Sequence, residues 1–527
     1  MLQLNPKLKA LIEKLWDRFW SGGISNPLSA IEQITYLLFM KQLDDLDLKR
    51  EKDAEFTREP FTSRFLGSFF LPGDTKKKKP IDKATLRWSH FKHMKAELML
   101  THVQQKVFPF IKNLNGSGST FTRHMDNAVF LIPSANLLQG AVSIIDDIFV
   151  EIEREAREEG HLFQDIQGDV YEMLLNEISS AGKNGQFRTP RHIIKFITEL
   201  VDPKLGNRIC DPACGTAGFL LDAYQYIVTQ LAKRNPPKGK LFEPDDDGFI
   251  RSSLSGMLTQ NNKDILDQSL YGYDFDATMV RLALMNLMMH GVDNPNVDYQ
   301  DTLSKRFSEE GKYDIVVANP PFTGSIDKGE ISELLHLKTT KTELLFLERI
   351  FTLLRVGGTA GVIVPQGVLF GSASAFVAAR KKLVEEAELK AVVALPSGVF
   401  KPYAGVATAI LVFTRGGKTE QTWFSRIDND GLSLDDKRQR IAGSDLPSVV
   451  EQWKVRDPKQ SSDRRAKCFF VSVQELRDGK YDLSFGRYQE AEHNEREYEE
   501  PKAILERLKI TENSILHDIA ELDQWLK

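Results

Sequence analysis

The chain has 527 residues, which is enough for two or three domains with sizeable cores. Apolar residues make up 41% of it and charged residues 27%, which is ordinary for a globular protein. The formal net charge is −5, whereas a protein that binds nucleic acid on its own normally carries a basic surface.

The three cysteines exclude a disulfide-stabilised scaffold and a zinc-binding domain. Cys210, Cys214 and Cys468 form neither a disulfide framework nor the spacing of a zinc site. We interpret them as small buried residues of a reducing compartment, and we predict no metal site. The sequence has no signal-peptide pattern and no apolar run of about 18 residues. We therefore expect a cytoplasmic protein that contacts no membrane.

Residues 1–160 are predicted to be helical. Apolar residues recur there every three or four positions, which is the spacing of one helix face. Two such stripes stand out, and we interpret both as the core of a helical bundle. They consist of Leu8, Leu11, Ile12, Leu15, Trp16 and Phe19, followed by Ile31, Ile34, Leu37, Leu38 and Leu43.

A glycine-containing turn follows the first strand expected after this bundle. The strand is 208–210, the turn runs from Asp211 to Gly218, and an apolar helix comes next. This order opens many nucleotide-binding sheets. Gly215 would let the backbone approach a ligand, and Gly218 would let the helix pack closely. The carboxylate of Asp211 at the strand tip suits a ligand with an ammonium group rather than a pyrophosphate.

A second strand is expected at 270–274, and it also ends in an acid, Asp274. In doubly wound sheets an acid at this position accepts hydrogen bonds from ribose hydroxyls. Asp276 lies close enough to be an alternative, and either aspartate could instead cap the helix that follows. That helix is rich in methionine, which we interpret as core packing.

The tetrapeptide Asn319-Pro320-Pro321-Phe322 is the most informative motif, and it follows an apolar strand at 313–318. The Asn319 side chain and the Pro320 carbonyl can each accept one N–H of a planar amine. The prolines stiffen the turn, and Phe322 offers a face for a flat ring. The structural alternative is a tight turn with an aromatic plug.

Short β-rich runs alternate with helical runs from about 161 to 427. The strand candidates are 361–365, 391–395 and 409–413, and 343–354 reads as a helix that stops at glycines. This alternation predicts an α/β doubly wound sheet that is largely parallel and ends in an antiparallel hairpin.

The C-terminal region is predicted in two parts. Residues 428–495 are polar and read as irregular, and a helix is expected from Pro501 onward. Its apolar residues form a seam about three heptads long, which we expect to dock on another helix, within this chain or in a partner. The seam consists of Leu505, Leu508, Ile515, Ile519, Leu522 and Leu526.

Together these motifs resemble the S-adenosylmethionine-dependent amino-methyltransferases that act on DNA adenine. The resemblance is closest to the methylation (M) subunits of type I restriction–modification systems. It runs through most of the chain and is strongest over 165–413. It implies a methyltransferase sheet in a catalytic domain at 161–427, a helical N-terminal domain at 1–160 and a C-terminal region at 428–527 that ends in a partner-docking helix.

The resemblance also implies roles for individual residues. Catalysis falls to Asn319, Pro320, Pro321 and Phe322. Phe400 would be a second aromatic beside a flipped base, with sheet core as its alternative, and a turn acid is the alternative for Asp301. The family's pattern assigns cofactor contacts to Gln186, Phe187, Thr189, Pro190, Asp211, Ala213, Gly215, Thr216, Gly218, Asp274 and Asp301.

One stretch departs from the family's pattern. Residues 235–269, between the first two motifs, look like an inserted surface loop.

The partners that the resemblance implies are double-stranded DNA, a specificity subunit and a second copy of the M subunit. The restriction subunit is a further candidate. A net charge of −5 agrees with a partner that supplies much of the phosphate contact and all of the sequence reading. The protein would then be nucleoid-associated in a prokaryotic cytoplasm when it is bound to DNA.

Two other functions stay open at this point. The same tetrapeptide serves methyltransferases of protein glutamine and of ribosomal RNA guanine, and a catalytically inactive DNA-binding scaffold is a further alternative. The helical N-terminal domain, the C-terminal helix and the segment 186–190 favour the DNA enzyme. An inactive scaffold would have no need to keep Asp211, Asp274 and Asn319 together.

Overall fold

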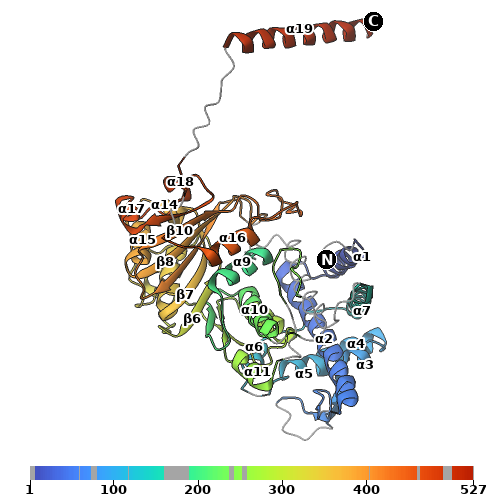
Figure 1. The fold of residues 1–527 in the computed structure, drawn as a ribbon. Helices are drawn as coiled ribbons and strands as arrows, with labels where there is room; N and C mark the ends of the chain where they lie inside the picture. Colours follow the sequence, from blue (N-terminus) through green and yellow to red (C-terminus); the bar gives the residue numbers. More distant parts are fainter. Residues whose placement is uncertain are drawn as a thin grey trace. The chain divides into compact units, whose positions relative to one another are not determined.

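The computed structural model describes most of the chain, and these residues fall into two compact units, one within 1–488 and one within 489–527. The second unit holds helix α19 (Pro501–Trp525), so the helix predicted from Pro501 is confirmed (Figure 1). None of the helices described is long and apolar enough to cross a membrane. The described residues are 6–58, 60–72, 80–116, 118–158, 189–234, 236, 242–251, 258–402, 404–459, 463–490 and 501–525.

The N-terminal residues form a helical bundle, as predicted. Helix α1 (Pro6–Ser21) buries Leu8, Ile12, Leu15 and Phe19, which is the first apolar stripe. Asn26 is the N-cap of α2 (Pro27–Thr57), because its side chain accepts the N–H groups of the second and third helical residues. The remaining elements of this part are β1 (Ser68–Phe69), β2 (Ile81–Asp82), η2 (Lys83–Leu86), α3 (Trp88–Phe91), α4 (Ala96–His102), η3 (Val103–Val107), α5 (Phe108–Lys112), α6 (Thr120–Met125) and α7 (Ala135–Glu158).

Nine of the described strands form one sheet, in the order β11-β10-β8-β9-β7-β6-β3-β4-β5. Strands β5, β4, β3, β6 and β7 are parallel, and β9 lies antiparallel between β7 and β8. The predicted parallel sheet with a late hairpin is confirmed. The strands are β3 (Ile209–Asp211), β4 (Leu270–Asp274), β5 (Asn296–Tyr299), β6 (Tyr313–Ala318), β7 (Leu354–Pro365), β8 (Ala387–Leu395), β9 (Thr408–Arg415), β10 (Gln421–Arg426) and β11 (Cys468–Ser472).

Helices cover both faces of the sheet because its strands are apolar on both sides. In β6, Ile315 and Val317 join the core beneath α9, α10 and α12, while Val316 and Ala318 join the core beneath α13 and α15. Figure 1 shows α9 and α10 between the sheet and the N-terminal helices. These helices and the smaller ones are α9 (Arg191–Val201), α10 (Gly218–Arg234), α11 (Gln260–Asp267), α12 (Ala277–Met289), η5 (Lys328–Glu330), α13 (Thr342–Leu353), α14 (Gly367–Phe370), α15 (Ser374–Glu385), α16 (Leu446–Val455), α17 (Val473–Asp478) and α18 (Phe485–Tyr488).

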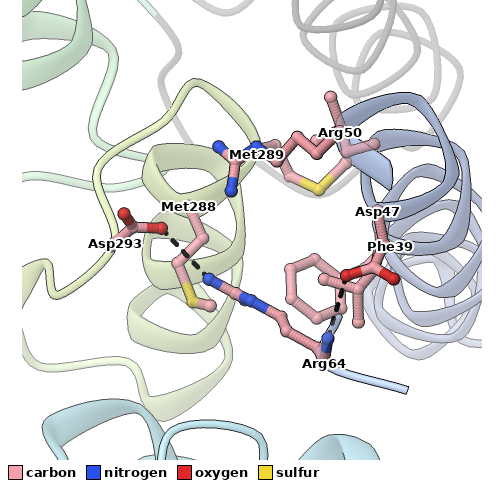
Figure 2. Close-up of a pocket in the computed structure, with 9 residues that line it drawn as sticks. Phe39, Asp47, Arg50, Arg64, Met288, Met289 and Asp293 are labelled. Atoms are coloured by element: carbon pink, nitrogen blue, oxygen red, sulfur yellow. Dashed lines mark hydrogen bonds and ion pairs between the residues drawn. The ribbon is translucent and has the colours of Figure 1, made fainter. Parts of the chain in front are cut away.

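The N-terminal bundle packs against α12, which is the methionine-rich helix. The guanidinium of Arg281 on α12 donates to the carboxylate of Glu32 on α2 at 2.7 Å, and both side chains are nearly buried. Figure 2 shows a second contact, in which Arg64 binds Asp293 at 3.0 Å beside a small pocket lined partly by Met288. All four methionines of α12 are buried, so their interpretation as core packing is confirmed.

Residues 428–488 differ from the irregular stretch that the sequence predicts. Strand β11 pairs antiparallel with β10, and α16 packs against α9. The expected boundary at 427/428 therefore lies between two neighbouring strands of one sheet. The limits of the three domains otherwise stay a prediction.

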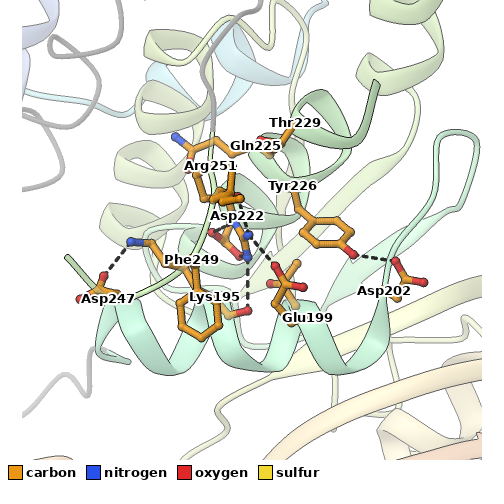
Figure 3. Close-up of polar contacts among 12 residues, drawn as sticks. Lys195, Glu199, Asp202, Asp222, Gln225, Tyr226, Thr229, Asp247, Phe249 and Arg251 are labelled. Atoms are coloured by element: carbon orange, nitrogen blue, oxygen red, sulfur yellow. Dashed lines mark hydrogen bonds and ion pairs between the residues drawn. The ribbon is translucent and has the colours of Figure 1, made fainter. Parts of the chain in front are cut away.

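The segment 235–269 is also more than the surface loop that its composition predicts. In its described part, Phe249 is 3% exposed, the side chain of Arg251 is buried, and α11 follows. Arg251 makes a bidentate contact with Asp222 on α10 and a bond of 2.9 Å with Glu199 on α9 (Figure 3). A buried guanidinium needs such partners, and they hold the segment against the helices.

Further charges extend this network along α9. Lys195 donates to Asp245 and Asp247 at 2.5 and 2.6 Å, and Lys454 on α16 donates to Glu199 at 2.9 Å. The network therefore joins α9, α10, α16 and the segment 242–251 on one face of the sheet.

Breaking this network should destabilise the protein strongly. Arg251→Ala leaves the buried carboxylate of Asp222 without this cation and leaves Glu199 with only the more exposed Lys454. The free energy of unfolding should therefore fall by about 3–5 kcal/mol. Urea unfolding followed by circular dichroism measures this change. The matched control is Arg234→Ala at the exposed end of α10, which should change it by less than about 0.5 kcal/mol. Equal effects of the two variants would contradict the role given to Arg251.

Candidate functional site

The turn after β3 has the conformation that a close ligand contact requires. Gly215 has φ +51°, and a Cβ added there would meet no atom within 4 Å, so there is open space beside the backbone. Ala217 has φ +65°, which is a strained value for a residue with a side chain. Gly218 begins α10, and a Cβ there would lie 3.0 Å from Ile194 of α9, so this glycine permits close helix packing as predicted.

Asp211 ends β3 as a buried carboxylate. It is 1% exposed and accepts the N–H of Ala213 at 3.1 Å. Burial, together with the nearby charge of Asp274, raises the pKa of Asp211 to about 8. A cationic group bound beside it would favour the charged form. The site therefore suits the ammonium ligand that the sequence predicts.

Asp274 holds the same turn from β4. Its carboxylate accepts the N–H of Gly215 and the N–H of Asp276, each at 2.9 Å, and burial raises its pKa. The alternative role of helix cap falls to Asp276, which accepts the N–H groups of Thr278 and Met279.

Asp301 lies exposed in the turn after β5. It accepts the N–H of Leu303 at 3.0 Å, which is the behaviour of a turn acid. Its neighbour Thr302 is buried and donates to the carbonyl of Pro212 at 3.1 Å, which ties this turn to the one after β3. A cofactor contact by Asp301 stays a prediction.

Asn319 follows β6 at the same edge of the sheet. Its Nδ2 donates to the hydroxyl of Thr189 at 2.9 Å. Its Oδ1 is buried and has no hydrogen-bond partner among the described residues. A buried acceptor without a donor is costly, and in a native protein it calls for a ligand or a water. The site thus holds a carbonyl oxygen ready for an N–H group.

Phe322 and Phe400 lie next to each other, as the predicted stacking pair requires. Their ring centroids are 5.4 Å apart and the planes meet at 89°, which is an edge-to-face contact. They are 5% and 2% exposed, so Phe400 is also part of the core. A flat base can stack here only if one ring turns away. The stacking roles stay a prediction.

The structure brings most predicted site residues together. The turns after β3, β4, β5 and β6 all lie at the carboxyl ends of parallel strands, and Thr189 and Pro190 join them just before α9. Gln186 and Phe187 lie outside the described residues. Thr189, predicted as a cofactor contact, here holds Asn319.

Three residues near the site were missed by the sequence analysis. Phe275, between two acids at the tip of β4, is 67% exposed, and an aromatic in that place could have signalled a ring-binding surface. Asn286 on α12 donates to the carbonyl of Thr216 at 2.8 Å, and Thr302 binds Pro212 as described above. Nothing in the sequence around Asn286 or Thr302 distinguishes them from core residues.

Comparison with known proteins decides the family. The model of the N-6 DNA Methylase family matches residues 163–497, and that of the HsdM N-terminal domain matches 8–145. The chain belongs to the N-6 DNA methylase family. Its matched N-terminal domain and its curated relatives make it the M subunit of a type I restriction–modification system, and thus a DNA adenine N6-methyltransferase.

Two curated relatives illustrate the likeness. The methylase subunit of the type I restriction enzyme EcoEI from Escherichia coli is 28% identical over 442 residues, which covers 82% of this chain and 80% of the relative. The methylase subunit of StySJI from Salmonella typhimurium is 33% identical over 429 residues, covering 79% of this chain and 68% of the relative.

Solved structures agree on the architecture of this N-6 DNA methylase. One such structure comes from a study of complex assembly and conformational transition in a type I system. It is 26% identical to this chain, the match covers 99% of each of the two chains, and the TM-score is 0.63. A modification subunit from Vibrio vulnificus YJ016 is 22% identical with a TM-score of 0.65, covers 89% of this chain and 92% of its own, and shows the shared fold.

Proposed function

We propose that this DNA N6-methyltransferase binds S-adenosylmethionine over the tips of β3 and β4 and presents a flipped adenine to it at Asn319. One observation carries the proposal. Within the described part of the chain, the Oδ1 of Asn319 is buried without a partner, at the edge of the sheet where the turns after β3, β4, β5 and β6 lie.

The residues after β3 and β4 fit the cofactor. The buried carboxylate of Asp211 complements an ammonium or sulfonium charge, and the open space beside Gly215 admits a ligand close to the backbone. Asp274 would accept from a ribose hydroxyl, and the exposed ring of Phe275 would cover a flat adenine. When bound, S-adenosylmethionine supplies a methyl carbon made electrophilic by the neighbouring sulfonium.

Asn319 and Pro320 would bind the amine that receives the methyl group. The lone pair of adenine N6 is delocalised into the ring, so the amine is a weak nucleophile. If the Oδ1 of Asn319 and the carbonyl of Pro320 each accept one N6 hydrogen, the lone pair is directed at the methyl carbon. Both oxygens then stabilise the positive charge that develops on nitrogen. Catalysis would thus rest on positioning and electrostatics.

The adenine must leave the double helix before it can reach Asn319. Stacking on Phe322 would offset part of the cost of flipping. Because Phe322 and Phe400 now pack edge to face, one ring has to turn before the base can enter.

We infer the partner subunits from the net charge of the chain and from the apolar seam of α19. A net charge of −5 leaves most phosphate contacts and the choice of sequence to a specificity subunit. The predicted seam is exposed in its described part, with Leu508 60% and Leu522 62% exposed, while Leu526 lies outside the described residues. We assign helix α19 to that subunit. A second M subunit and a restriction subunit complete the proposed assembly on prokaryotic DNA, in the cytoplasm.

The affinity for S-adenosylmethionine should depend on the charge of Asp211. The free protein protonates this carboxyl below its pKa of about 8, and only the charged form attracts a cation. Affinity should therefore rise roughly tenfold or more between pH 6.5 and 8.5. Calorimetric titration at both pH values measures this.

Asp211→Asn is the control for that titration. It should bind weakly at both pH values, and any slope that it retains reports the ligand's own ionisation. Equal slopes in the two proteins would refute the assignment of Asp211.

Removing the acceptor of Asn319 should abolish most activity and spare the cofactor. Asn319→Ala should lower the rate of methyl transfer by about 100-fold or more, because a positioned hydrogen-bonding group is lost from the transition state. Its dissociation constant for S-adenosylmethionine should stay within about twofold of wild type. Near-normal turnover by a folded variant would rule the role out.

The substrate can be identified with tritiated S-adenosylmethionine and DNA from a host that lacks this system. The protein is assayed alone and with the specificity subunit of its own system, and the DNA is then digested to nucleosides. We expect label in N6-methyladenine only when the partner is present. Label in protein or in ribosomal RNA instead would overturn the proposed substrate.

A further inference from the structure

The loop between β10 and α16 contains a buried acid that no motif predicts. Asp430 is 2% exposed although it lies in a polar loop. Its Oδ2 accepts from Nε2 of His192 at 2.9 Å and from the guanidinium of Arg438, and its Oδ1 accepts the N–H of Leu432 at 3.3 Å. Burial opposes the charge, but the bonds from His192 and Arg438 hold the pKa of Asp430 below its ordinary value. The three side chains form one hydrogen-bonded cluster.

His192 connects this cluster to the catalytic turn. It lies in the first turn of α9, where the carbonyl of Pro190 accepts the N–H groups of Ile193 and Ile194 at 3.0 and 3.1 Å. Thr189 directly precedes Pro190, and proline restricts the backbone on both sides. A shift of His192 would therefore move the backbone that carries the Thr189 hydroxyl, and this hydroxyl accepts from Nδ2 of Asn319.

The same loop contacts the aromatic side of the site. At Gly398, where φ is +95°, an added Cβ would lie 2.6 Å from the carbonyl oxygen of Leu434, so the two backbones touch. Lys401 also pairs with Asp436 of the loop at 3.3 Å. Phe400 lies between these two anchors and packs against Phe322. The loop therefore contacts both segments that touch the tetrapeptide. These are the start of α9, which it contacts through His192, and residues 398–401.

We propose that Asp430, with His192 and Arg438, is a positioning residue for methyl transfer: it fixes the start of α9 so that Thr189 holds the Asn319 amide with its oxygen free for the substrate. A rotated amide would turn an N–H toward the substrate amine and repel it. The inference rests on the proposed function of Asn319. It predicts a loss of rate without a loss of ligand affinity.

The decisive variant is Asp430→Asn, which keeps the size of the side chain and removes its charge. Single-turnover methyl transfer by the assembled complex should fall about tenfold or more, while the dissociation constants for S-adenosylmethionine and DNA change less than twofold. Arg438→Gln, which leaves the bond between Asp430 and His192, should give a smaller loss of the same kind and serves if Asp430→Asn does not fold.

Glu199→Gln is the matched control, because it breaks a similarly buried ion pair at the other end of the same helix. It should lower the melting temperature to a comparable degree and leave the methyl-transfer rate within twofold of wild type at 25 °C. Equal loss of rate in Glu199→Gln and Asp430→Asn would show that Asp430 acts only through stability, which overturns the proposal.

A double-mutant cycle tests the path through Thr189. Thr189→Val alone should slow methyl transfer, and adding Asp430→Asn to it should cost little more, because both changes release the same amide. Losses that multiply would overturn the proposed path.

Hydrogen–deuterium exchange gives a readout that does not depend on activity. Amides of residues 191–195 should exchange faster in Asp430→Asn than in wild type or Glu199→Gln. Unchanged exchange would overturn the inference whatever the substrate, whereas faster exchange in a protein that methylates no adenine would overturn the proposed function alone.

Discussion

Strand β3 has a parallel neighbour on each side. From β3 the chain continues to β4 and β5 on one side and then returns to form β6 on the other. In doubly wound sheets, ligands bind at the carboxyl ends of the strands, at the point where the strand order reverses in this way. Asp211, Asp274 and Asn319 each stand at the end of one of these three strands. The chemistry of the site depends on this single feature of the sheet, because no local interaction would gather residues so far apart in the chain.

The site keeps polar groups incompletely satisfied, while the charged side chains along α9 are paired. Asp211 is buried next to another acid, and Asn319 holds an oxygen that no described residue donates to; both reduce the stability of the free protein. Behind them, Arg251 and the charges along α9 are matched almost bond for bond. Such a paired support would keep the unsatisfied groups from relaxing toward each other.

The sequence predicted what short segments determine. The apolar run at 313–318 and the turns after β3 and β6 were assigned correctly, because strand pattern, glycine and proline act over a few residues. It could not predict β11, which becomes a strand only by pairing with β10, or the bond between His192 and Asp430, which are 238 positions apart. The burial of Arg251 was missed for the same reason, because its acidic partners lie on α9 and α10.

The edge-to-face contact of Phe322 and Phe400 has a consequence for the free enzyme. Both rings are nearly buried, and the Oδ1 of Asn319, three residues before Phe322, is not exposed to solvent either. Water and small amines are poor at displacing an aromatic ring, whereas a purine carries enough surface to replace the contact that it breaks. The pair would therefore protect the methyl donor from wasteful reaction with solvent until an adenine arrives.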